Sequence, residues 1–361
     1  MAQYPGSETE RRMMPDALVA FVEAIFRGCG MGSRDANLLA AALVNADQRG
    51  THSHGTLRVP EYVRKLVEEG VDPRGRPTIV RSNGNAIIVD GGNAMGQVVA
   101  DFAMRVAIRR AARSGIALAA ARNSNHCGAM DRWAMLALEH DMIGIAATNA
   151  LPTMAPWGGA DKIVGINPLA AAFPAAEEEP IVLDTAFGAT AHGKIRVYHQ
   201  KSERIPEGWA FDRDGQPTTD TAAALAGLIQ PIGGHKGVGL AIVTGMLSTL
   251  LSGASYGTEL GNMVAGPQPG HDGHVFIAID VAAFQPAAAF KARVDSIARQ
   301  IRRSRRREGV AALYPPGLLE AEFMRRYAVE GIPLNEETLA GLRSAALQMK
   351  VALPDFMSAG R

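Results

Sequence analysis

Short apolar runs interleave with helical segments through the middle of this chain, and this alternation restricts its fold more than any other feature. Helical spacing of apolar side chains marks residues 98–115 and 129–141. Runs typical of β-strands, each bounded mostly by Gly, Pro or Asn, occupy residues 78–82, 86–91, 115–123, 142–150, 168–174, 180–184 and 274–281. Irregular interleaving of this kind favours a mixed α/β sheet over a barrel or a sandwich.

The two ends of the chain are helical by the same criterion. Amphipathic patterns cover residues 14–27, 33–49, 59–70, 286–308 and 335–350. Ser33 is the expected N-cap of the second of these helices. We therefore predict a helical domain made of residues 1–75 and 286–361, beside a mixed α/β domain of residues 76–285. The arginine run at 302–308 is expected to be a solvated helix face, with a cofactor phosphate contact as the alternative.

Charge and cysteine content narrow the class of protein. A formal net charge of +1 gives no reason to expect a nucleic-acid partner. Cys29 and Cys127 are the only cysteines, and without a CxxC pair they predict neither a disulfide framework nor a zinc site. We expect a cytoplasmic protein, since residues 1–15 lack the apolar core of a signal peptide. The uncharged segment 237–258 is long enough to span a bilayer, but its glycines and hydroxyl side chains favour a buried central helix.

Residues 188–194, "GATAHGK", match a phosphate-binding P-loop except at the next position. A P-loop requires Ser or Thr there to bind Mg²⁺, and this chain has Ile195. His192 also places a bulky ring inside the loop. No GxGxxG follows a predicted strand, so the dinucleotide fingerprint of a Rossmann domain is absent as well.

The stretch "DQRGTHSHGTLRVPEY" (47–62) gathers the side chains best suited to chemistry. If its second half is helical, His54, Arg58 and Tyr62 recur every four residues and share one face. Arginine binds a carboxylate through two parallel hydrogen bonds, and histidine transfers protons near neutrality. These residues therefore suit a small carboxylate substrate, the alternative being a set of surface residues around a loop. His52 by itself is expected to be a surface residue of the loop.

Two further polar stretches follow predicted elements. "ARNSNHCGAMDRW" places His126 just after an apolar strand, where α/β proteins build sites. "PIGGHKGVGLA" places Lys236 in the first turn of a helix, whose free N–H groups attract phosphate or carboxylate. Metal binding is the rival interpretation for the histidines, but no third ligand has a suitable spacing and HExxH is missing, so we expect no metal.

Taken together, these motifs resemble the NAD(P)-dependent malate/L-lactate dehydrogenase family of the second type along about 300 residues. This family includes sulfolactate and ureidoglycolate dehydrogenases and diketogulonate and Δ1-piperideine-2-carboxylate reductases. The stretches that carry the resemblance are "DQRGTHSHGTLRVPEYV", "NSNHCGA", "TNALPTMAPWGGADKIVGINPLAAAFP", "IVLDTAFGATAHGKI" and "GGHKGVGLA". The resemblance implies a non-Rossmann α/β domain that binds NAD or NADP, and a homodimer with its site near the subunit contact.

The resemblance also implies residue roles. His54 or His126 would transfer the proton, with Ser53 beside His54, and Arg58 and Tyr62 would hold the substrate carboxylate. The cofactor would lie along Asn149, Ala150, Asp184, Thr185, Ala186, Lys194, His235, Lys236, Pro316 and Gly317. The chain departs from the family pattern at Met130–Trp133 and at Leu318–Leu319, which leaves the substrate and the choice between NAD and NADP open.

Three functions are compatible with these motifs. The leading hypothesis is a dehydrogenase that interconverts a 2-hydroxy acid and its 2-oxo acid, with a small carboxylate as its substrate and no membrane partner. The second is a reductase of a cyclic imine carboxylate, such as Δ1-piperideine-2-carboxylate or Δ1-pyrroline-2-carboxylate. The third, from another class, is a dinucleotide-binding protein without catalytic activity.

Overall fold

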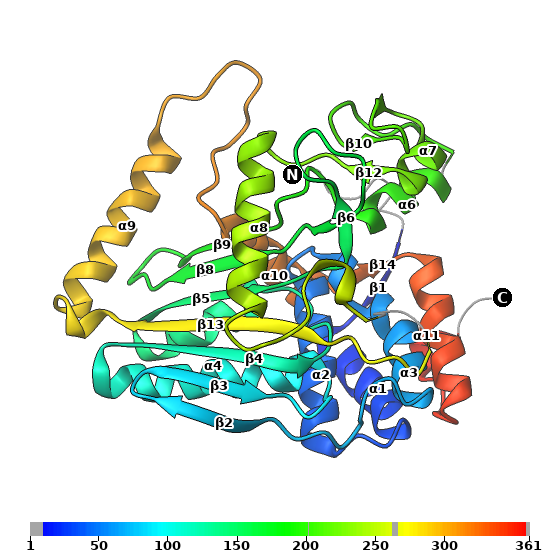
Figure 1. Cartoon of the computed structure of the whole chain (residues 1–361), viewed down its shortest axis with the longest axis horizontal. Coiled ribbons are helices and arrows are strands. Elements are labelled where there is room, and N and C mark those ends of the chain that lie inside the picture. Colours follow the sequence, from blue (N-terminus) through cyan, green and yellow to red (C-terminus); the bar gives the residue numbers. More distant parts are fainter. Residues whose placement is uncertain (1–9, 201, 262–265, 359–361) are drawn as a thin grey trace.

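A seven-stranded mixed sheet forms the centre of the molecule (Figure 1). The computed structural model describes residues 10–200, 202–261 and 266–358. The strands, in their order across the sheet, are β2 (Thr78–Asn83), β3 (Ala86–Asp90), β4 (Ile116–Ser124), β13 (Asp272–Asp280), β5 (Met142–Thr148), β8 (Leu169–Phe173) and β9 (Ile181–Thr185). The strand predictions and the mixed α/β fold class are thereby confirmed.

Strands β3 and β4 are the parallel pair of this sheet, while the other neighbours run antiparallel. A parallel connection requires a crossover, and helix α4 (Gly96–Ser114) provides it. Helix α4 packs on one face of the sheet and helix α8 (His235–Thr249) crosses the other (Figure 1). Both faces of the central strands are therefore covered, which explains why their apolar runs are nearly continuous.

The N-terminal helices pack beside one end of the sheet together with a helix from the C-terminal part (Figure 1). They are α1 (Pro15–Gly28), α2 (Ser33–Gln48), α3 (Val59–Val67) and α11 (Glu336–Gln348). Strands β1 (Arg11–Met13) and β14 (Ile332–Leu334) pair antiparallel and join the two ends of the chain. The buried side chains of this unit and of the sheet form one continuous hydrophobic core.

A smaller lobe, which the sequence patterns did not predict, is built from the segment between β5 and β8 and from residues after β9. It has its own buried cluster, which includes Phe187, Ile195 and Ile229. Its elements are β6 (Pro152–Met154), β7 (Val164–Gly165), α6 (His192–Gln200), β10 (Ala210–Phe211), β11 (Pro217–Thr218), α7 (Thr221–Ala226) and β12 (Leu228–Ile229). Ile195, which rules out a P-loop, is a core residue of this lobe.

Helix α8 is not the fully buried helix that the uncharged segment predicts. Its small residues, such as Ala241 and Gly245, are buried, whereas Val243 is 63% exposed. The other exposed large apolar side chains of this segment are Leu240, Met246, Leu247, Leu250 and Leu251. A helix that is apolar all round needs a second partner for its outer face. Among the described residues, no helix is long and apolar enough to cross a membrane.

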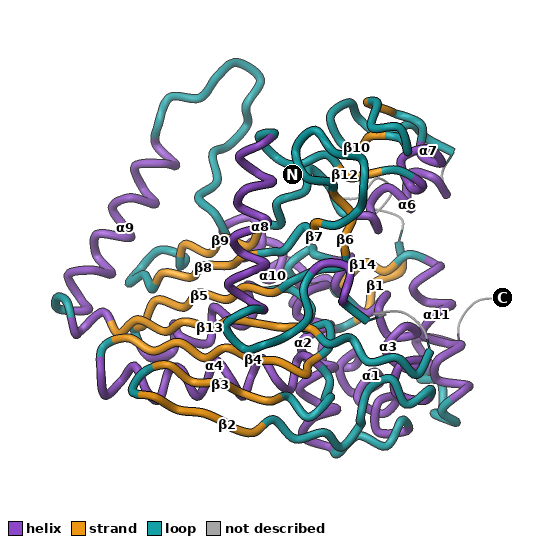
Figure 2. The backbone as a smooth tube through the Cα atoms, viewed as in Figure 1, coloured by secondary structure: helices purple, strands orange, loops and turns teal. Residues whose placement is uncertain are grey.

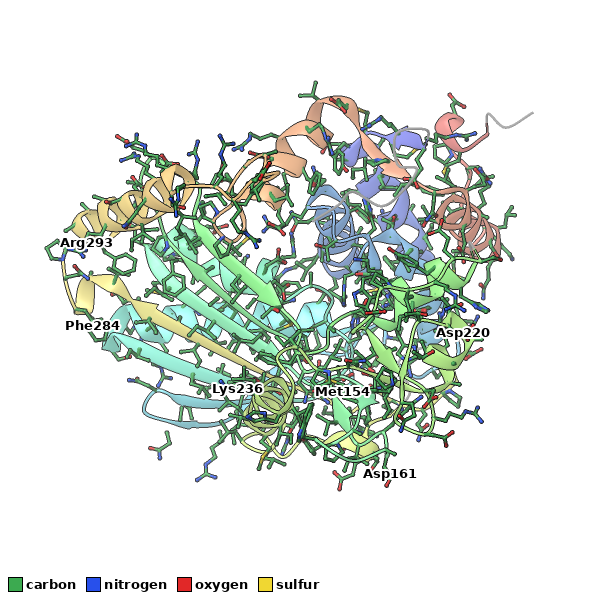
Figure 3. All side chains as sticks on the ribbon, turned by 90° about the horizontal axis from the view of Figure 1, so that it is seen from above. Met154, Asp161, Asp220, Lys236, Phe284 and Arg293 are labelled. Atoms are coloured by element: carbon green, nitrogen blue, oxygen red, sulfur yellow. The ribbon has the colours of Figure 1, made fainter. Side chains whose placement is uncertain are left out.

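Helix α9 (Ala287–Arg303) lies apart from the other terminal helices and extends from the far end of β13 (Figure 2). Seen from above, Phe284 and Arg293 mark this end of the molecule and Asp220 marks the opposite end, in the small lobe (Figure 3). Buried Asp295 ties α9 to the turn before β9 by accepting hydrogen bonds from three backbone N–H groups at 176–178. Residues 304–317 then lead back to helix α10 (Leu318–Glu330).

Some local predictions differ from the structure. The N-cap of α2 is Gly32 rather than Ser33, and Ser33 is already helical. The arginine run is only partly helical, because α9 ends at Arg303 and Arg305–Arg307 are exposed beyond it. The segment 129–141 is a short helix, α5 (Asp131–Met135), continued by a 3₁₀ helix, η4 (Leu136–His140). Residues 1–9 lie outside the described residues, and the two-domain division stays a prediction.

Candidate active site

One edge of the central sheet collects most of the predicted site. At this edge β4 ends at Ser124, and the first residue of β13, Asp272, pairs with it. The next strands follow in register, because His274 pairs with Thr148 at the end of β5. Thr185 pairs with Leu169 at the end of β9. His126 and Asn149, which follow β4 and β5, and Asp184, near the end of β9, therefore lie at one edge.

The turn that carries Ser53, His54 and Arg58 is built around a buried carboxylate. Asp47, at 1% exposure, lies near the end of α2. Its Oδ1 pairs with His52 Nδ1 at 2.8 Å, while its Oδ2 accepts hydrogen bonds from the N–H and the hydroxyl of Thr56, both at 2.7 Å. A Cβ at Gly55 would overlap this carboxylate, so the turn requires glycine. His52, expected to be a surface residue of the loop, instead supports the turn through its contact with Asp47.

The predicted single helical face over residues 54–62 is wrong in part. The chain forms two 3₁₀ turns, η2 (His52–His54) and η3 (Thr56–Arg58), before α3 begins at Val59. The many hydrogen bonds to Asp47 stabilise these tight turns against a continuous helix. Arg58 and Tyr62 are still one helical turn apart, but His54 reaches the site from a separate turn.

His54 and His126 lie against each other, although 72 residues of sequence separate them. Their rings stack with centroids 5.6 Å apart and planes at 19°. Ser53 Oγ lies 3.0 Å from His54 Nδ1, and Tyr62 Oη lies 2.6 Å from His126 Nδ1. Gly96 lies at the start of α4, and a Cβ there would overlap the carbonyl oxygens of Asn125 and His126. Close backbone packing therefore fixes where His126 sits.

Arg58 is held from two sides and keeps part of its guanidinium available. Its Nε donates to the carbonyl of Ser53 at 2.8 Å, and its Nη1 pairs with Glu61 at 2.7 Å. Within the part of the chain that the structure describes, Nη2 has no protein acceptor. The side chain is 16% exposed, so this N–H group suits a carboxylate that enters the site.

The surroundings keep both histidines neutral at neutral pH. Burial, followed by the charge of Arg58, lowers the pKa of His54 to about 4. Burial lowers the pKa of His126 well below its usual value, and the neighbouring His54, Arg58 and His274 add to this effect. Burial raises the pKa of Tyr62, which therefore stays a neutral phenol. A neutral imidazole beside a neutral phenol is ready to accept a proton.

The predicted cofactor residues gather in two groups. In the first, Pro316 accepts a hydrogen bond from Val182 of β9, and Gly317 packs on the same residue. Asp184 at the end of β9 accepts hydrogen bonds through Oδ2 from the N–H groups of Met130 and Asp131. This group contains Asp184, Thr185, Ala186, Pro316 and Gly317.

The second group lies at the start of α8. Just before this helix, the N–H of Ile232 donates a hydrogen bond to the carbonyl of Phe187, which follows β9. His235 and Lys236 are both exposed there, and the His235 ring is 6.1 Å from that of Trp157. A cleft of about 430 Å³ opens beside Trp157 and Val238, between the loop 155–160 and the lobe. Lys194 lies in the small lobe, where its Nζ is 4.8 Å from the ring centre of Trp209.

Several features fit a dinucleotide. The side-chain amide nitrogen of Asn149 is buried without a hydrogen-bond partner among the described residues, so it is free to donate to a ligand. Ala150 instead uses its N–H to bind Asn167 within the protein. Gly233 and Gly234 have φ of 60° and 64° and leave the first N–H groups of α8 open to a phosphate. Among the described residues, no group of three potential metal ligands occurs.

Sequence patterns did not single out two residues of this edge. Gln97 donates to Tyr62 Oη at 3.2 Å, and Asp272 lies beside His126 in a small cavity. A buried glutamine in the apolar segment 96–100 was a signal for the first, because such a residue needs a polar partner. Asp272 lies in a Gly- and Pro-rich stretch just before the predicted strand, and only the strand register reveals its position.

Comparison with known proteins agrees with this architecture. The family model of malate/L-lactate dehydrogenase matches residues 13–343. The chain is 36% identical to L-sulfolactate dehydrogenase of Methanocaldococcus jannaschii, over 97% of this chain and 98% of that protein. It is 34% identical to malate dehydrogenase of Pyrococcus horikoshii, over 94% and 96%. It is 30% identical to a Δ1-pyrroline-2-carboxylate/Δ1-piperideine-2-carboxylate reductase of Pseudomonas putida, over 94% and 98%.

Solved structures of the first two relatives superpose with TM-scores of 0.87 and 0.88, covering 94% and 96% of this chain and 98% and 97% of theirs. The chain therefore belongs to the malate/L-lactate dehydrogenase family, as its motifs predict. It is an oxidoreductase that uses a nicotinamide cofactor, and the alternative of a catalytically silent binding protein is set aside.

Proposed function

We propose that this enzyme interconverts a small 2-hydroxy acid and its 2-oxo acid with NAD or NADP. The observation that carries the proposal is the stack of His54 on His126, with Arg58 beside it, at the sheet edge that also holds Asn149 and Asp184. The substrate class follows from a guanidinium for the carboxylate and an imidazole for the hydroxyl proton. Relatives named for sulfolactate and malate support the same class.

Each side chain of the site has a distinct role in this proposal. Arg58 binds the substrate carboxylate through Nη2. His126 accepts the hydroxyl proton at Nε2, since its Nδ1 is engaged by Tyr62, and returns the proton in the reverse direction. His54, oriented by Ser53, holds the substrate oxygen on the other side. Tyr62 therefore orients His126, a different role from the carboxylate contact that the family resemblance implies.

Tyr62 and Gln97 hold His126 in the tautomer that can accept a proton. Because Nε2 takes the proton, neutral His126 carries its hydrogen on Nδ1 and donates it to the Tyr62 oxygen. The Tyr62 hydroxyl must then donate elsewhere, and the Gln97 amide lies within hydrogen-bond reach of it. The oxygen of Gln97, buried without a partner among the described residues, is the acceptor that a turn of the amide makes available.

The residues that would hold the cofactor are Asn149, Ala150, Asp184, Thr185, Ala186, Lys194, His235, Lys236, Pro316 and Gly317. When bound, the nicotinamide ring supplies or accepts the hydride at the substrate carbon. Exposed Asp184 and the buried Asn149 amide offer one acceptor and one donor to the ligand, and the start of α8 offers N–H groups to its phosphates. Both NAD and NADP are kept as candidates.

Reduction of a cyclic imine carboxylate is the second candidate function. The relative from Pseudomonas putida is named for this reaction, and its substrates also carry a carboxylate next to the reacting carbon. The same Arg58 contact would hold this group, and the histidines would serve the nitrogen instead of an oxygen. The two functions therefore differ in the shape of the pocket and share its charged groups.

A substrate panel tests the proposed function. We expect pyruvate, oxaloacetate or sulfopyruvate to cause oxidation of NADH or NADPH, followed by the loss of absorbance of the reduced cofactor. Faster oxidation with Δ1-piperideine-2-carboxylate than with any of the oxo acids would favour the imine reductase. No oxidation of either cofactor with any of these compounds would contradict both candidate functions.

We also propose a homodimer, supported by the exposed apolar face of α8. The double variant Val243→Asp, Leu250→Asp is expected to be a monomer, because a charge buried in the interface opposes association. Sedimentation velocity measures the mass of each species. Val329, 81% exposed on α10, provides the matched control, and Val329→Asp should leave the mass unchanged. A wild-type monomer, or a dimer that survives the α8 changes, would contradict this interface.

The predicted setting of the enzyme completes the proposal. Its partner is a small carboxylate molecule, and neither nucleic acid nor membrane is expected to bind. Cys29 and Cys127 are both free thiols, in keeping with a reducing cytoplasm. The helical domain of residues 1–75 and 286–361 and the α/β domain of residues 76–285 are proposed as its two units, with the substrate turn of η2 and η3 at their boundary.

A further inference from the structure

A small polar cavity adjoins the pair formed by His126 and Tyr62. Its volume is about 10 Å³, close to the room that one buried water needs. The cavity is lined by Tyr62, Lys65, Val71, Met95, Asn125, His126 and Asp272. A buried water also needs two to four polar partners, and this lining supplies an ammonium, a carboxyl, an amide, a phenol and an imidazole.

Two of these partners are ionisable side chains with no part in the site described above. Lys65 lies one helical turn after Tyr62 on α3, is 2% exposed, and donates to the carbonyl of Gln268. Asp272 begins β13 and pairs in register with Ser124, two residues before His126. Lys65 is buried and Asp272 is half-buried, and a buried ammonium needs a nearby opposite charge, so their joint presence next to His126 calls for an explanation.

Each of the two groups affects the ionisation of the other. Burial raises the pKa of Asp272 to about 7, and the charge of Lys65 opposes this rise. Burial lowers the pKa of Lys65, while the charges of Asp272 and Glu68 oppose that change. Asp272 therefore changes its charge in the neutral range, within the cavity that it shares with His126.

We propose that this cavity holds one water bonded to Asp272 and to the His126–Tyr62 pair, and that Asp272 is a positioning residue that controls the protonation of His126. The effect on turnover rests on the proposed function, whereas the effect on His126 does not. An ionised Asp272 favours the imidazolium, so the pKa of His126 is higher when Asp272 is charged. The other ionisable groups facing this region are His54, Arg58, Cys127, His274 and, beside Lys65, Glu68.

Nitrogen-15 spectra of the histidine rings in the cofactor-free protein test this proposal. In the wild type, the His126 signals should respond to a titration near pH 7 that belongs to Asp272. Asp272→Asn should abolish that response and leave His126 neutral across the same range, because the asparagine side chain never becomes charged. Lys65→Met should move the response upward by about 1 unit, because Asp272 loses an attractive charge. Asp280→Asn, at the opposite end of β13, should change neither.

Turnover provides the second measurement. The dependence of kcat on pH should show a step near pH 7 in the wild type and in Asp280→Asn. This step should be absent in Asp272→Asn. Persistence of the near-neutral response in Asp272→Asn, or no movement of it in Lys65→Met, would overturn the proposal. If the wild type turns over none of the tested acids, the proposed function fails, while the histidine spectra still decide the role of Asp272.

Discussion

Replacement of His126 by alanine is expected to reduce kcat by roughly 10²–10⁴-fold, the range found when a general acid or base is lost. In the proposed mechanism, His126 transfers the proton directly to and from the substrate oxygen, and no other side chain takes over at Nε2. The affinity for the reduced cofactor should stay unchanged, because the cofactor residues lie on other strands. Stopped-flow turnover and cofactor fluorescence measure the two quantities separately.

Two variants control this result. His140→Ala removes an exposed histidine of η4 and should keep full activity. His54→Ala should raise KM and lower kcat less than His126→Ala does, since His54 holds the substrate oxygen without carrying its proton. The pH profile gives an independent check. Because the pKa of His126 is lowered, protonation of His126 should reduce kcat/KM for hydroxy-acid oxidation only in acidic solution, below the step near pH 7 that Asp272 produces. Full turnover in His126→Ala would refute the assignment.

Replacement of Arg58 by methionine is expected to raise KM for a 2-oxo acid about 10–150-fold. A hydrogen bond to a charged group contributes about 1.5–3 kcal/mol, and about 1.4 kcal/mol corresponds to a factor of ten. Methionine keeps much of the length of the side chain while it removes the guanidinium. Steady-state kinetics with saturating cofactor measure the change.

Arg58 also donates to the carbonyl of Ser53, so its loss could disturb the turn that carries His54. Arg58→Lys separates the two effects, because it keeps the positive charge but cannot form two parallel hydrogen bonds. We expect its KM to lie between those of the wild type and Arg58→Met. Equal KM values in all three proteins would show that Arg58 does not bind the carboxylate.

The sequence predicted the central sheet well, for a physical reason. Strands such as β4 and β5 are covered by helices on both faces, so they appear as short continuous apolar runs with turn residues at their ends. The small lobe was missed because its strands contain two or three residues each, too few to show a period. Helix α8 was misjudged because apolar composition does not distinguish the sheet-facing side from the outer side.

The site shows the same division between local and long-range information. His54, Arg58 and His126 could be selected because each lies in a distinctive polar stretch, and the family motifs connected them. Gln97 and Asp272 could not be selected in this way, since their importance comes from contacts across 35 residues to Tyr62 and from strand register. Asp47 was noticed as one of several polar residues, but its role as the support of the η2–η3 turn depends on hydrogen bonds that only the fold reveals.

The central claim is that His54, Arg58 and His126 surround one substrate beside the nicotinamide ring. A crystal structure of the enzyme with reduced cofactor and oxamate, an unreactive analogue of pyruvate, tests it most directly. We predict the oxamate carboxylate on the Arg58 guanidinium, its amide end within hydrogen-bond reach of the two imidazoles, and the nicotinamide ring between this group and Asn149. Oxamate bound elsewhere, or a nicotinamide ring distant from both histidines, would contradict the account.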